Sequence, residues 1–511
     1  MAHEKLINEI ARRRAKMLEM GGPEKLARIK ARGNLNARQR IDHLVDPGSF
    51  LETGMHAYSI REETRHKSPG DGKLAGFGRI AGRDVALVSN DFTVLGASSS
   101  QINTKKMRHM KRVASERGMP LVLLGESSGG RIPDRMGSLG RTTIGQDPVE
   151  YRRLRESPWA SALLGECYGS STWYACMADY VVMRKGAIMA VSSPRVTALA
   201  INQPIAPEDL GGWRLHTEVT GLVDQAFDTD AEVLDAIKTF LSYLPANRAE
   251  PPPLADVPEV SDADAEAILD IVPEERSRVY DIRKVAGLII DRGSLFELKP
   301  RFGRTVVTAL ARLDGRTVGV IANNPLVKGG ALDADACDKV VSFIVLCDSF
   351  NVPLMMLVDV PGFLIGIEGE RKRAPGKIIN WMNALSLASV PKISVIIRKS
   401  YGQAYLNMGG GRNSDEVVAW PTADLGFMDP RLSVNVVYGV TEDQDPERFR
   451  DLLAEVERDT SAWDLAGYYD AQDVIDPRET RGWLIRALEI HRDRMTGGVG
   501  SHLLSSWPTS Y

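Results

Sequence analysis

The fold is decided by a stretch of sequence that occurs twice. Gly82-Arg-Asp-Val-Ala-Leu-Val-Ser-Asn-Asp-Phe-Thr-Val-Leu-Gly96 corresponds to Gly315-Arg-Thr-Val-Gly-Val-Ile-Ala-Asn-Asn-Pro-Leu-Val-Lys-Gly329, and the two copies are offset by 233 residues. The same offset aligns Lys106 with Lys339, Pro120 with Pro353, Gly129 with Gly362, and Tyr168-Gly169 with Tyr401-Gly402. Beyond these pairs the offset becomes 236, which aligns Asp179 with Asp415 and Pro194-Arg195 with Pro430-Arg431. A register held over more than 100 residues indicates an internal duplication.

The duplication predicts two domains. The chain has 511 residues, which is more than one ordinary hydrophobic core serves. Between the copies, residues 247–264 contain Pro251-Pro252-Pro253 and several acidic side chains, a composition typical of a linker. We therefore predict a first domain over residues 1–246, a linker over 247–264 and a second domain over 265–511.

Each copy has the same order of apolar runs. Residues 85–88 and 318–321 are expected to form strands, and each is followed by a Gly-containing turn and a helix, over residues 102–115 and 336–350. A short apolar strand comes next, over 121–124 and 354–358, with proline before it and glycine after it. Strands that alternate with helices predict an α/β fold with buried strands.

The composition excludes several classes of protein. With 26% charged residues and a net charge of −3, nothing points to nucleic acid or to an anionic membrane as a partner. No stretch approaches the roughly 20 apolar residues that a membrane span needs. The four cysteines form no C-x-x-C pair, so neither a zinc site nor a disulfide framework is expected. We expect a cytoplasmic protein without a bound metal.

The sequence offers almost no side-chain catalyst. None of the eight histidines lies in a metal-binding or triad-like spacing, and His216 is as readily structural as catalytic. Small residues instead follow the predicted strands at matching places: Gly96-Ala97-Ser98, Ser128-Gly129-Gly130-Arg131 and Tyr168-Gly169-Ser170-Ser171 in the first copy, and Gly329-Gly330-Ala331, Pro361-Gly362-Phe363 and Tyr401-Gly402-Gln403-Ala404 in the second. Such turns leave backbone N–H groups free to bind a developing oxyanion. Two oxyanion holes, and thus chemistry on two carbonyl groups, are predicted.

Several motifs resemble a known family, the carboxyltransferase (β) subunits of biotin-dependent acyl-CoA carboxylases of the propionyl-CoA and methylcrotonyl-CoA carboxylase type. The most specific are Arg40-Ile-Asp-His-Leu-Val-Asp-Pro-Gly-Ser-Phe50, Asn90-Asp-Phe-Thr-Val-Leu-Gly96, Glu208-Asp-Leu-Gly-Gly212, Val358-Asp-Val-Pro-Gly-Phe-Leu364 and Ala419-Trp-Pro-Thr-Ala423. The resemblance covers residues 25 to 500. It implies an α/β fold of two tandem crotonase-like (ClpP/crotonase) domains, an enzyme that uses a coenzyme A thioester, and a cofactor, biotin, carried by a partner chain.

The resemblance also implies an assembly and a mechanism. The first domain of one subunit would face the second domain of a neighbour within a hexamer, a trimer of dimers. The expected partner is the biotin carboxylase and biotin carboxyl carrier (α) subunit, because this sequence has no biotin-attachment motif of its own. One oxyanion hole would stabilise the thioester enolate and the other the biotin ureido oxygen, so that no side-chain base is needed.

The family's functional positions can be carried over by motif. The catalytic backbone groups map to Gly169, Ser170, Gln403 and Ala404. The substrate-binding positions map to Gly96, Ala97, Gly129, Gly130, Arg131, Tyr168 and Leu406. The biotin-binding positions map to Gly329, Gly330, Gly362, Tyr401 and Gly402.

The sequence departs from the family pattern at both holes. Ser170 and Gln403 stand where members usually have glycine, Glu166 and Tyr168 replace proline and alanine, and the motif that ends in Arg131 is one residue short. A backbone N–H survives each replacement, but the added side chains fill space near the ligand. Three further functions therefore stay open: an acyl-CoA decarboxylase, a biotin-free crotonase-type enzyme and a non-catalytic paralogous subunit.

Overall fold

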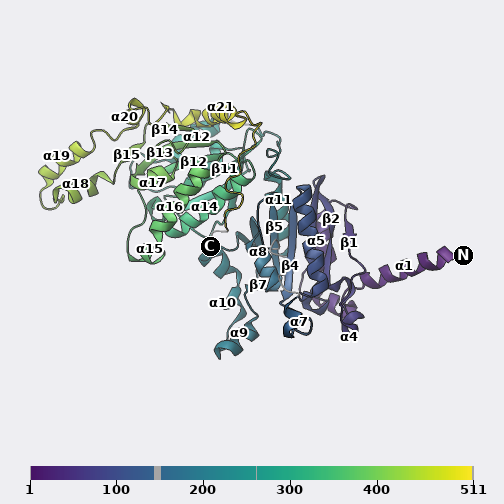
Figure 1. Cartoon of the computed structure of the whole chain (residues 1–511). Coiled ribbons are helices and arrows are strands. Elements are labelled where there is room, and N and C mark those ends of the chain that lie inside the picture. The colour runs from purple at the N-terminus through teal and green to yellow at the C-terminus, as the bar shows by residue number, and fades with distance from the viewer. Residues whose placement is uncertain (1, 143–150, 260–261, 509–511) are drawn as a thin grey trace. The chain divides into compact units, whose positions relative to one another are not determined.

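The chain folds into two compact units that divide between Arg248 and Ala249. The computed structural model describes residues 2–142, 151–259 and 262–508. Figure 1 draws the first unit from purple to teal and the second from green to yellow. Each unit holds one mixed sheet covered by helices.

The sheet of the first unit has the strand order β1-β2-β3-β4-β5-β6-β8, and β7 pairs with the end of β5. The strands from β3 onward are parallel, whereas β1, β2 and β3 are antiparallel to one another. The strands are β1 (Leu51–Thr53), β2 (Lys73–Ile80), β3 (Arg83–Asn90), β4 (Leu121–Ser128), β5 (Trp159–Tyr168), β6 (Tyr180–Arg184), β7 (Ile188–Ala190) and β8 (Gln225–Phe227).

The second unit repeats this sheet strand by strand. Its order is β16-β14-β13-β12-β11-β10-β9, and β15 pairs with the end of β13, as β7 does with β5. The strands are β9 (Phe296–Leu298), β10 (Val306–Leu313), β11 (Arg316–Asn323), β12 (Leu354–Val360), β13 (Lys392–Tyr401), β14 (Glu416–Ala419), β15 (Asp424–Gly426) and β16 (Asp473–Val474). The predicted α/β fold with an internal duplication is confirmed.

The helices follow the same repeat. In the first unit they are α1 (Ala2–Leu18), α2 (Pro23–Ala31), α3 (Ala37–Leu44), α4 (Glu62–Arg65), α5 (Gln101–Arg117), α6 (Ile132–Arg135), α7 (Gly137–Arg141), α8 (Ser170–Cys176), α9 (Pro194–Ile201), α10 (Pro207–Gly211) and α11 (Asp230–Tyr243). In the second they are α12 (Asp262–Ile271), α13 (Ile282–Ile289), α14 (Ala334–Ser349), α15 (Ile367–Arg371), α16 (Ala374–Leu387), α17 (Gly402–Asn407), α18 (Pro430–Tyr438), α19 (Pro446–Val456), α20 (Ala462–Gly467) and α21 (Thr480–Arg492). Short helical turns are η1 (Pro69–Gly72), η2 (Leu95–Ala97), η3 (Leu215–Val219), η4 (Lys328–Gly330) and η5 (Pro477–Glu479).

Equivalent helices begin in the same way in both units. Ser100 caps α5 by accepting from the N–H of Asn103, and Asp333 caps α14 by accepting from the N–H of Ala336. Both caps satisfy N–H groups of the first helical turn, which have no partner within a helix. The helix that crosses each sheet therefore starts at one defined place after β3 or β11.

A buried lysine ties each of these helices to the sheet. The Lys106 ammonium donates to the carbonyl of Lys73, the first residue of β2, and the Lys339 ammonium donates to that of Val306, the first residue of β10, at 2.7 Å. Both lysines are almost fully buried. Backbone carbonyls offset the loss of water around each ammonium, so the pair that the sequence offset aligned has the same structural role in both units.

The segment predicted as a linker packs within the second unit. The N–H of Ala255 donates to the carbonyl of Gly315 at 2.8 Å, and the Asn351 amide donates to the carbonyl of Glu250 at 2.8 Å. Prolines keep the backbone of this segment extended, and its carbonyls remain free to accept such bonds. The unit boundary accordingly lies at the start of the predicted linker.

Candidate active site

Three strand ends meet at one edge of the first sheet. The turn after β3 contains Gly96, where a methyl group would lie 2.6 Å from Ser128 Oγ at the end of β4. The next strand end follows β5, where a methyl group on Gly169 would lie 3.7 Å from the Cα atom of Gly129. The carboxyl ends of neighbouring parallel strands are the usual place for a binding site in an α/β fold. The structure thus brings the small residues of the first copy together.

The second unit builds the same edge. Leu332, just after η4, bridges to Phe363 after β12, as Ser99 bridges to Gly130 in the first unit. The N–H of Leu332 donates to the carbonyl of Gly362 at 3.0 Å. The glycines that the sequence singled out in the second copy therefore also lie at adjoining strand ends.

Each site ends at a glycine with positive φ at the start of a short helix. Gly169 has φ 65° and precedes α8, and Gly402 has φ 59° and opens α17. Neither helix has a side chain that caps its first turn. The first N–H groups of a helix have no intrahelical partner, so they remain available at both places. Such groups are suited to a developing oxyanion.

The two side chains that replace glycine have partners. Ser170 Oγ lies 2.5 Å from Ser99 Oγ, which joins the start of α8 to the segment after β3. The Gln403 amide donates to Asn407 Oδ1 at 3.1 Å, one turn further along α17. Gln403 is exposed and Ala404 is buried beside it. Leu406, on the same helix, packs close to Gly411.

The ionisable groups next to both glycines are held protonated. Burial raises the pKa of Tyr168 to about 12, and the pKa of Cys167 also to about 12. Burial, together with the hydrogen bond that the Tyr401 hydroxyl donates to the Asp424 carboxylate, raises the pKa of Tyr401. These groups are neither bases nor nucleophiles near neutral pH. The backbone N–H groups at the start of α8 and α17 are therefore the candidate catalytic groups at both strand ends.

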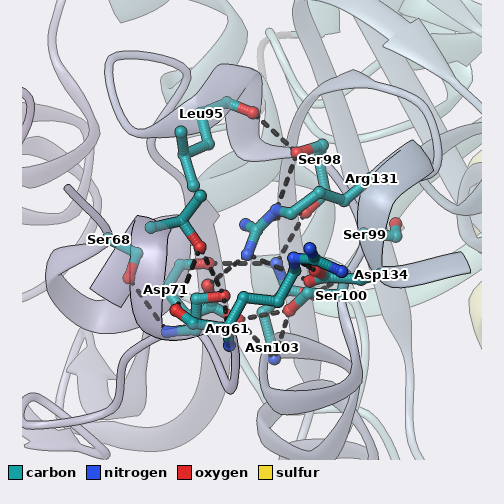
Figure 2. Close-up of polar contacts among 12 residues, drawn as sticks. Arg61, Ser68, Asp71, Leu95, Ser98, Ser99, Ser100, Asn103, Arg131 and Asp134 are labelled. Carbon is teal, nitrogen blue, oxygen red and sulfur yellow. Dashed lines mark hydrogen bonds and ion pairs between the residues drawn. The ribbon is translucent and has the colours of Figure 1, made fainter. Parts of the chain in front are cut away.

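Arg131 is held inside the unit. Its side chain is 6% exposed, and its guanidinium donates to Asp71 Oδ1 at 2.6 Å, to Ser98 Oγ at 3.1 Å and to the carbonyl of Ser98 at 3.2 Å. Figure 2 shows the Arg131 side chain reaching between Ser98 and Asp71. The Asp134 carboxylate lies 3.5 Å from the same guanidinium, and burial raises the pKa of Asp134. The charge of Arg131, which the sequence predicts to bind substrate, thus has a carboxylate partner within the unit.

Sequence reasoning missed the acidic residues of this edge. Asp71 carried no motif, and its partner Arg131 is 60 residues away. Glu126 and Asp359 could have been found, because the offset of 233 places an acidic residue at both positions. Within the described ranges, no group of His, Cys, Asp and Glu residues could hold a metal ion. In the same part of the chain, no helix is long and apolar enough to cross a membrane.

Comparisons with known proteins agree with this architecture. Residues 28–496 match the carboxyl transferase domain family. The chain is 35% identical to the propionyl-CoA carboxylase carboxyltransferase subunit of Haloferax mediterranei, over 97% of each sequence. It is 32% identical to the methylmalonyl-CoA decarboxylase subunit alpha of Veillonella parvula, over 96% of this chain and 94% of the relative.

A solved structure shows the same fold. The transcarboxylase 12S hexamer, crystallised with methylmalonyl-coenzyme A and methylmalonic acid, matches with a TM-score of 0.88 and 31% identity over 96% of each chain. The similarity thus spans both units, and it includes a protein whose crystals hold an acyl-CoA. The chain belongs to the carboxyl transferase family, which includes the carboxyltransferase subunits of acyl-CoA carboxylases.

Proposed function

We propose that the chain transfers a carboxyl group from carboxybiotin, carried by a partner protein, to the α-carbon (or the vinylogous carbon) of an acyl-CoA. The observation that carries this proposal is the pair of uncapped helix N-termini that follow Gly169 and Gly402. A reaction that forms an enolate on a thioester, and that leaves negative charge on the biotin ureido oxygen when the carboxyl group departs, needs two such donors and no side-chain base. The protonated Tyr168 and Tyr401 fit that requirement.

The first unit holds the acyl-CoA in this proposal. The N–H groups of Gly169 and Ser170 point toward the thioester oxygen and stabilise the negative charge that develops when the α-proton leaves. The adjoining turn and strand end allow the thioester to approach the backbone closely, because they carry little side-chain bulk. The proposed substrate contacts are Gly96, Ala97, Gly129, Gly130 and Tyr168, together with Leu406 of a neighbouring copy of the chain in the proposed assembly.

The second unit holds the biotin end of the partner. The N–H groups of Gln403 and Ala404 face the ureido oxygen, and the proposed biotin contacts are Gly329, Gly330, Gly362, Tyr401 and Gly402. When bound, carboxybiotin would supply the carboxyl group, and the biotin anion left behind would supply the base for the α-proton. The fit rests on the positive φ of Gly329, Gly330 and Gly402, which brings bare backbone to the strand ends.

The proposal extends to assembly. The related 12S protein is a hexamer, and we infer a hexamer of this chain that works with a biotin carboxylase and biotin carboxyl carrier subunit. Light scattering should give a mass near six chains of 56.1 kDa each. A stable, active monomer would contradict the assembly.

The test of the function is reconstitution. The purified chain is mixed with a biotin carboxylase, a biotinylated carrier, ATP, labelled bicarbonate and a panel of acyl-CoAs that includes propionyl-CoA. Acid-stable label should appear only with the complete mixture. Equal turnover with an unbiotinylated carrier would reject carboxyl transfer in favour of a biotin-free crotonase-type reaction.

A second candidate is the reverse direction, decarboxylation of a malonyl-type CoA ester. The similarity to the Veillonella parvula subunit favours it. The same mixture without ATP and bicarbonate measures the reverse transfer, from methylmalonyl-CoA to the free carrier, which a reversible carboxyltransferase also catalyses. Fixation that exceeds this reverse transfer identifies a carboxylase subunit.

A further inference from the structure

The turn after β3 is held in a strained backbone conformation. Three consecutive residues have positive φ: Leu95 at 50°, Gly96 at 61° and Ala97 at 47°. Only glycine adopts this left-handed region without steric cost, because the Cβ of other residues crowds the backbone. The strained residue Ala97 is also fully buried, so it lies within the packed interior of the unit. Something in the first unit must hold this turn in place.

The partners of Ser98 supply that hold. Arg131 donates to both the hydroxyl and the carbonyl of Ser98, and the Asn103 amide donates to the same carbonyl at 2.9 Å. Ser98 Oγ donates in turn to the carbonyl of Leu95 at 2.6 Å, which closes the turn (Figure 2). Arg131 thus makes two of the hydrogen bonds that hold Ser98, the residue directly after the strained turn.

Asp71 fixes the arginine and the start of the following helix together. Its carboxylate accepts from Arg131, from the Ser100 hydroxyl and from the N–H of Asn103 at 3.1 Å. Its carbonyl accepts from the Asn103 amide at 3.0 Å. Asp71 is fully buried. The charge of Arg131 is thereby balanced within the unit, and both ends of the segment from Ser98 to Ser100 are fixed.

The second unit has the same turn without this network. Lys328, Gly329 and Gly330 have φ of 51°, 64° and 86°. The offset of 233 places Arg304 where Asp71 lies and Leu364 where Arg131 lies, and both are exposed. Gly330 stands in place of Ala97 and removes the steric cost at that position. One unit therefore holds the turn with a buried ion pair, and the other relieves it with glycine.

We propose that the Asp71–Arg131 pair is a positioning device for the first oxyanion hole, which holds the turn after β3 against Ser170. The turn reaches the hole through the contact between the hydroxyls of Ser99 and Ser170, 2.5 Å apart, and through the bridge between Ser99 and Gly130. This role rests on the proposed function of the hole. It makes Arg131 act on the substrate through the turn rather than by contact.

The experiment compares the wild-type chain with the double variant Asp71→Asn/Arg131→Met, which removes both charges of the pair and leaves the Asp134 carboxylate with Arg61, 4.0 Å away. Hydrogen exchange of the peptide over residues 93–101 is measured first, because it needs no activity. The variant should exchange at least tenfold faster there while the core strands keep their protection. Unchanged exchange in this peptide would overturn the proposal.

A matched control removes another buried pair of the first unit, Arg153 and Asp179, which lie 2.5 Å apart near the start of β5. The double variant Arg153→Met/Asp179→Asn should lower the stability of the first unit without faster exchange over 93–101. Equal acceleration in both variants would show a loss of overall stability and would also overturn the proposal.

Kinetics then test the link to the hole. Once the wild-type chain is active in the reconstituted assay, the Asp71→Asn/Arg131→Met variant should lose about 10- to 100-fold in kcat, with KM changed less than about threefold, because a misplaced donor acts in the transition state. In an Ala97→Gly background, which copies Gly330, the same double substitution should cost about fivefold less, which corresponds to ~1 kcal/mol. An equal loss in both backgrounds would contradict the role in holding the turn. A wild-type chain without activity would refute the proposed function. The exchange result alone would then decide whether the Asp71–Arg131 pair holds the turn.

Discussion

Glu126 and Asp359 occupy the same position in the two units, each inside a bulge that interrupts the pairing of two parallel strands. The register shifts between Gly125 and Ser127 where β4 meets β5, and between Val358 and Val360 where β12 meets β13. A bulge bends its strand and re-aims the residues that follow. In both units, the residues that follow lead to the strand end at the candidate site.

The arginines that neutralise these carboxylates come from different elements. Asp359 binds Arg398 of the neighbouring strand at 2.9 Å, whereas Glu126 binds Arg40 of α3 at 2.6 Å. Gly165 stands at the position of Arg398, and a methyl group there would lie 2.2 Å from Glu126 Oε1. The first unit has no arginine at this strand position, and the Glu126 carboxylate lies beside Gly165 instead.

Gly165→Ala should therefore destabilise the first unit by about 2 kcal/mol, because the Glu126 carboxylate must leave the buried Arg40. Chemical denaturation followed by a probe of the first unit measures the loss. The control is Gly287→Ala in α13, where a methyl group meets nothing within 4 Å and helix propensity favours alanine. A Gly165→Ala chain as stable as the control would show that the added methyl group does not displace the Glu126 carboxylate.

Gly169→Ala and Gly402→Ala should differ in severity. Both substitutions place alanine at positive φ, at a cost of about 1–3 kcal/mol. The methyl group on Gly402 would also lie 2.9 Å from the carbonyl oxygen of Phe427, whereas the nearest neighbour of a methyl group on Gly169, the Cα atom of Gly129, would lie 3.7 Å away. Activity should fall in both variants, and the unfolding midpoint should fall further in Gly402→Ala. The reverse order would show that the methyl groups do not meet these neighbours.

Ser170→Gly and Gln403→Gly should shift the ranking of acyl-CoA substrates. Each removes a side chain beside a proposed hole and leaves its backbone N–H in place, and the exposed Gln403 loses only its bond to Asn407. Initial rates on a short acyl-CoA panel measure the shift. A uniform gain on all substrates would indicate that the side chains only obstruct. An unchanged panel would place both side chains away from the substrate.

Lys106→Met should reveal a pH dependence at the buried lysine. Burial lowers the pKa of Lys106 to about 8, and the unfolded value is about 10.4. Between these values the unfolded chain binds more protons, so this site adds stability as the pH rises. The stability deficit of Lys106→Met should thus grow by about 2 kcal/mol from pH 8 to pH 10.

The exposed neighbour Lys105 on the same helix provides the control for this titration. The difference between Lys105→Met and wild type is measured over the same pH range and subtracted from that of Lys106→Met. A constant deficit for Lys106→Met after this subtraction would exclude the buried titration.

The sequence predicted the fold well where the constant offset between the two copies aligns equivalent residues. The offset that aligned Lys106 with Lys339 also aligns the carbonyls they bind, on Lys73 and Val306, because duplicated strands keep their length. The predicted strand over 121–124 is shorter than β4, since polar residues such as Ser127 continue it once their hydroxyls find partners. Apolar runs mark the middle of such a strand and not its functional end.

The backbone of the candidate site was predictable from the sequence, but the buried ion pairs around it were not. Glycines after strands identified both positive-φ positions. The Asp71–Arg131 pair joins residues 60 apart, and the Arg40–Glu126 pair joins residues 86 apart. Long-range pairs leave no local pattern, because what matters is the distance in the folded chain. An alignment of the two halves points to Glu126, through the acidic residue that both bulges share, but it does not point to Asp71 or Arg131.

The origin of each arginine bears on the order in which the units can fold. In the second unit, Asp359 and Arg398 are 39 residues apart on adjacent strands, so pairing those strands brings the charges together. In the first unit, the negative charge of Glu126 in the bulge has no Arg40 beside it until α3 docks, which closes a loop of 86 residues. Longer loop closures slow folding, so the first unit is expected to mature later than the second. Loss of the first 40 residues would leave Glu126 and Asp230 without Arg40, while the second unit keeps its own compensation.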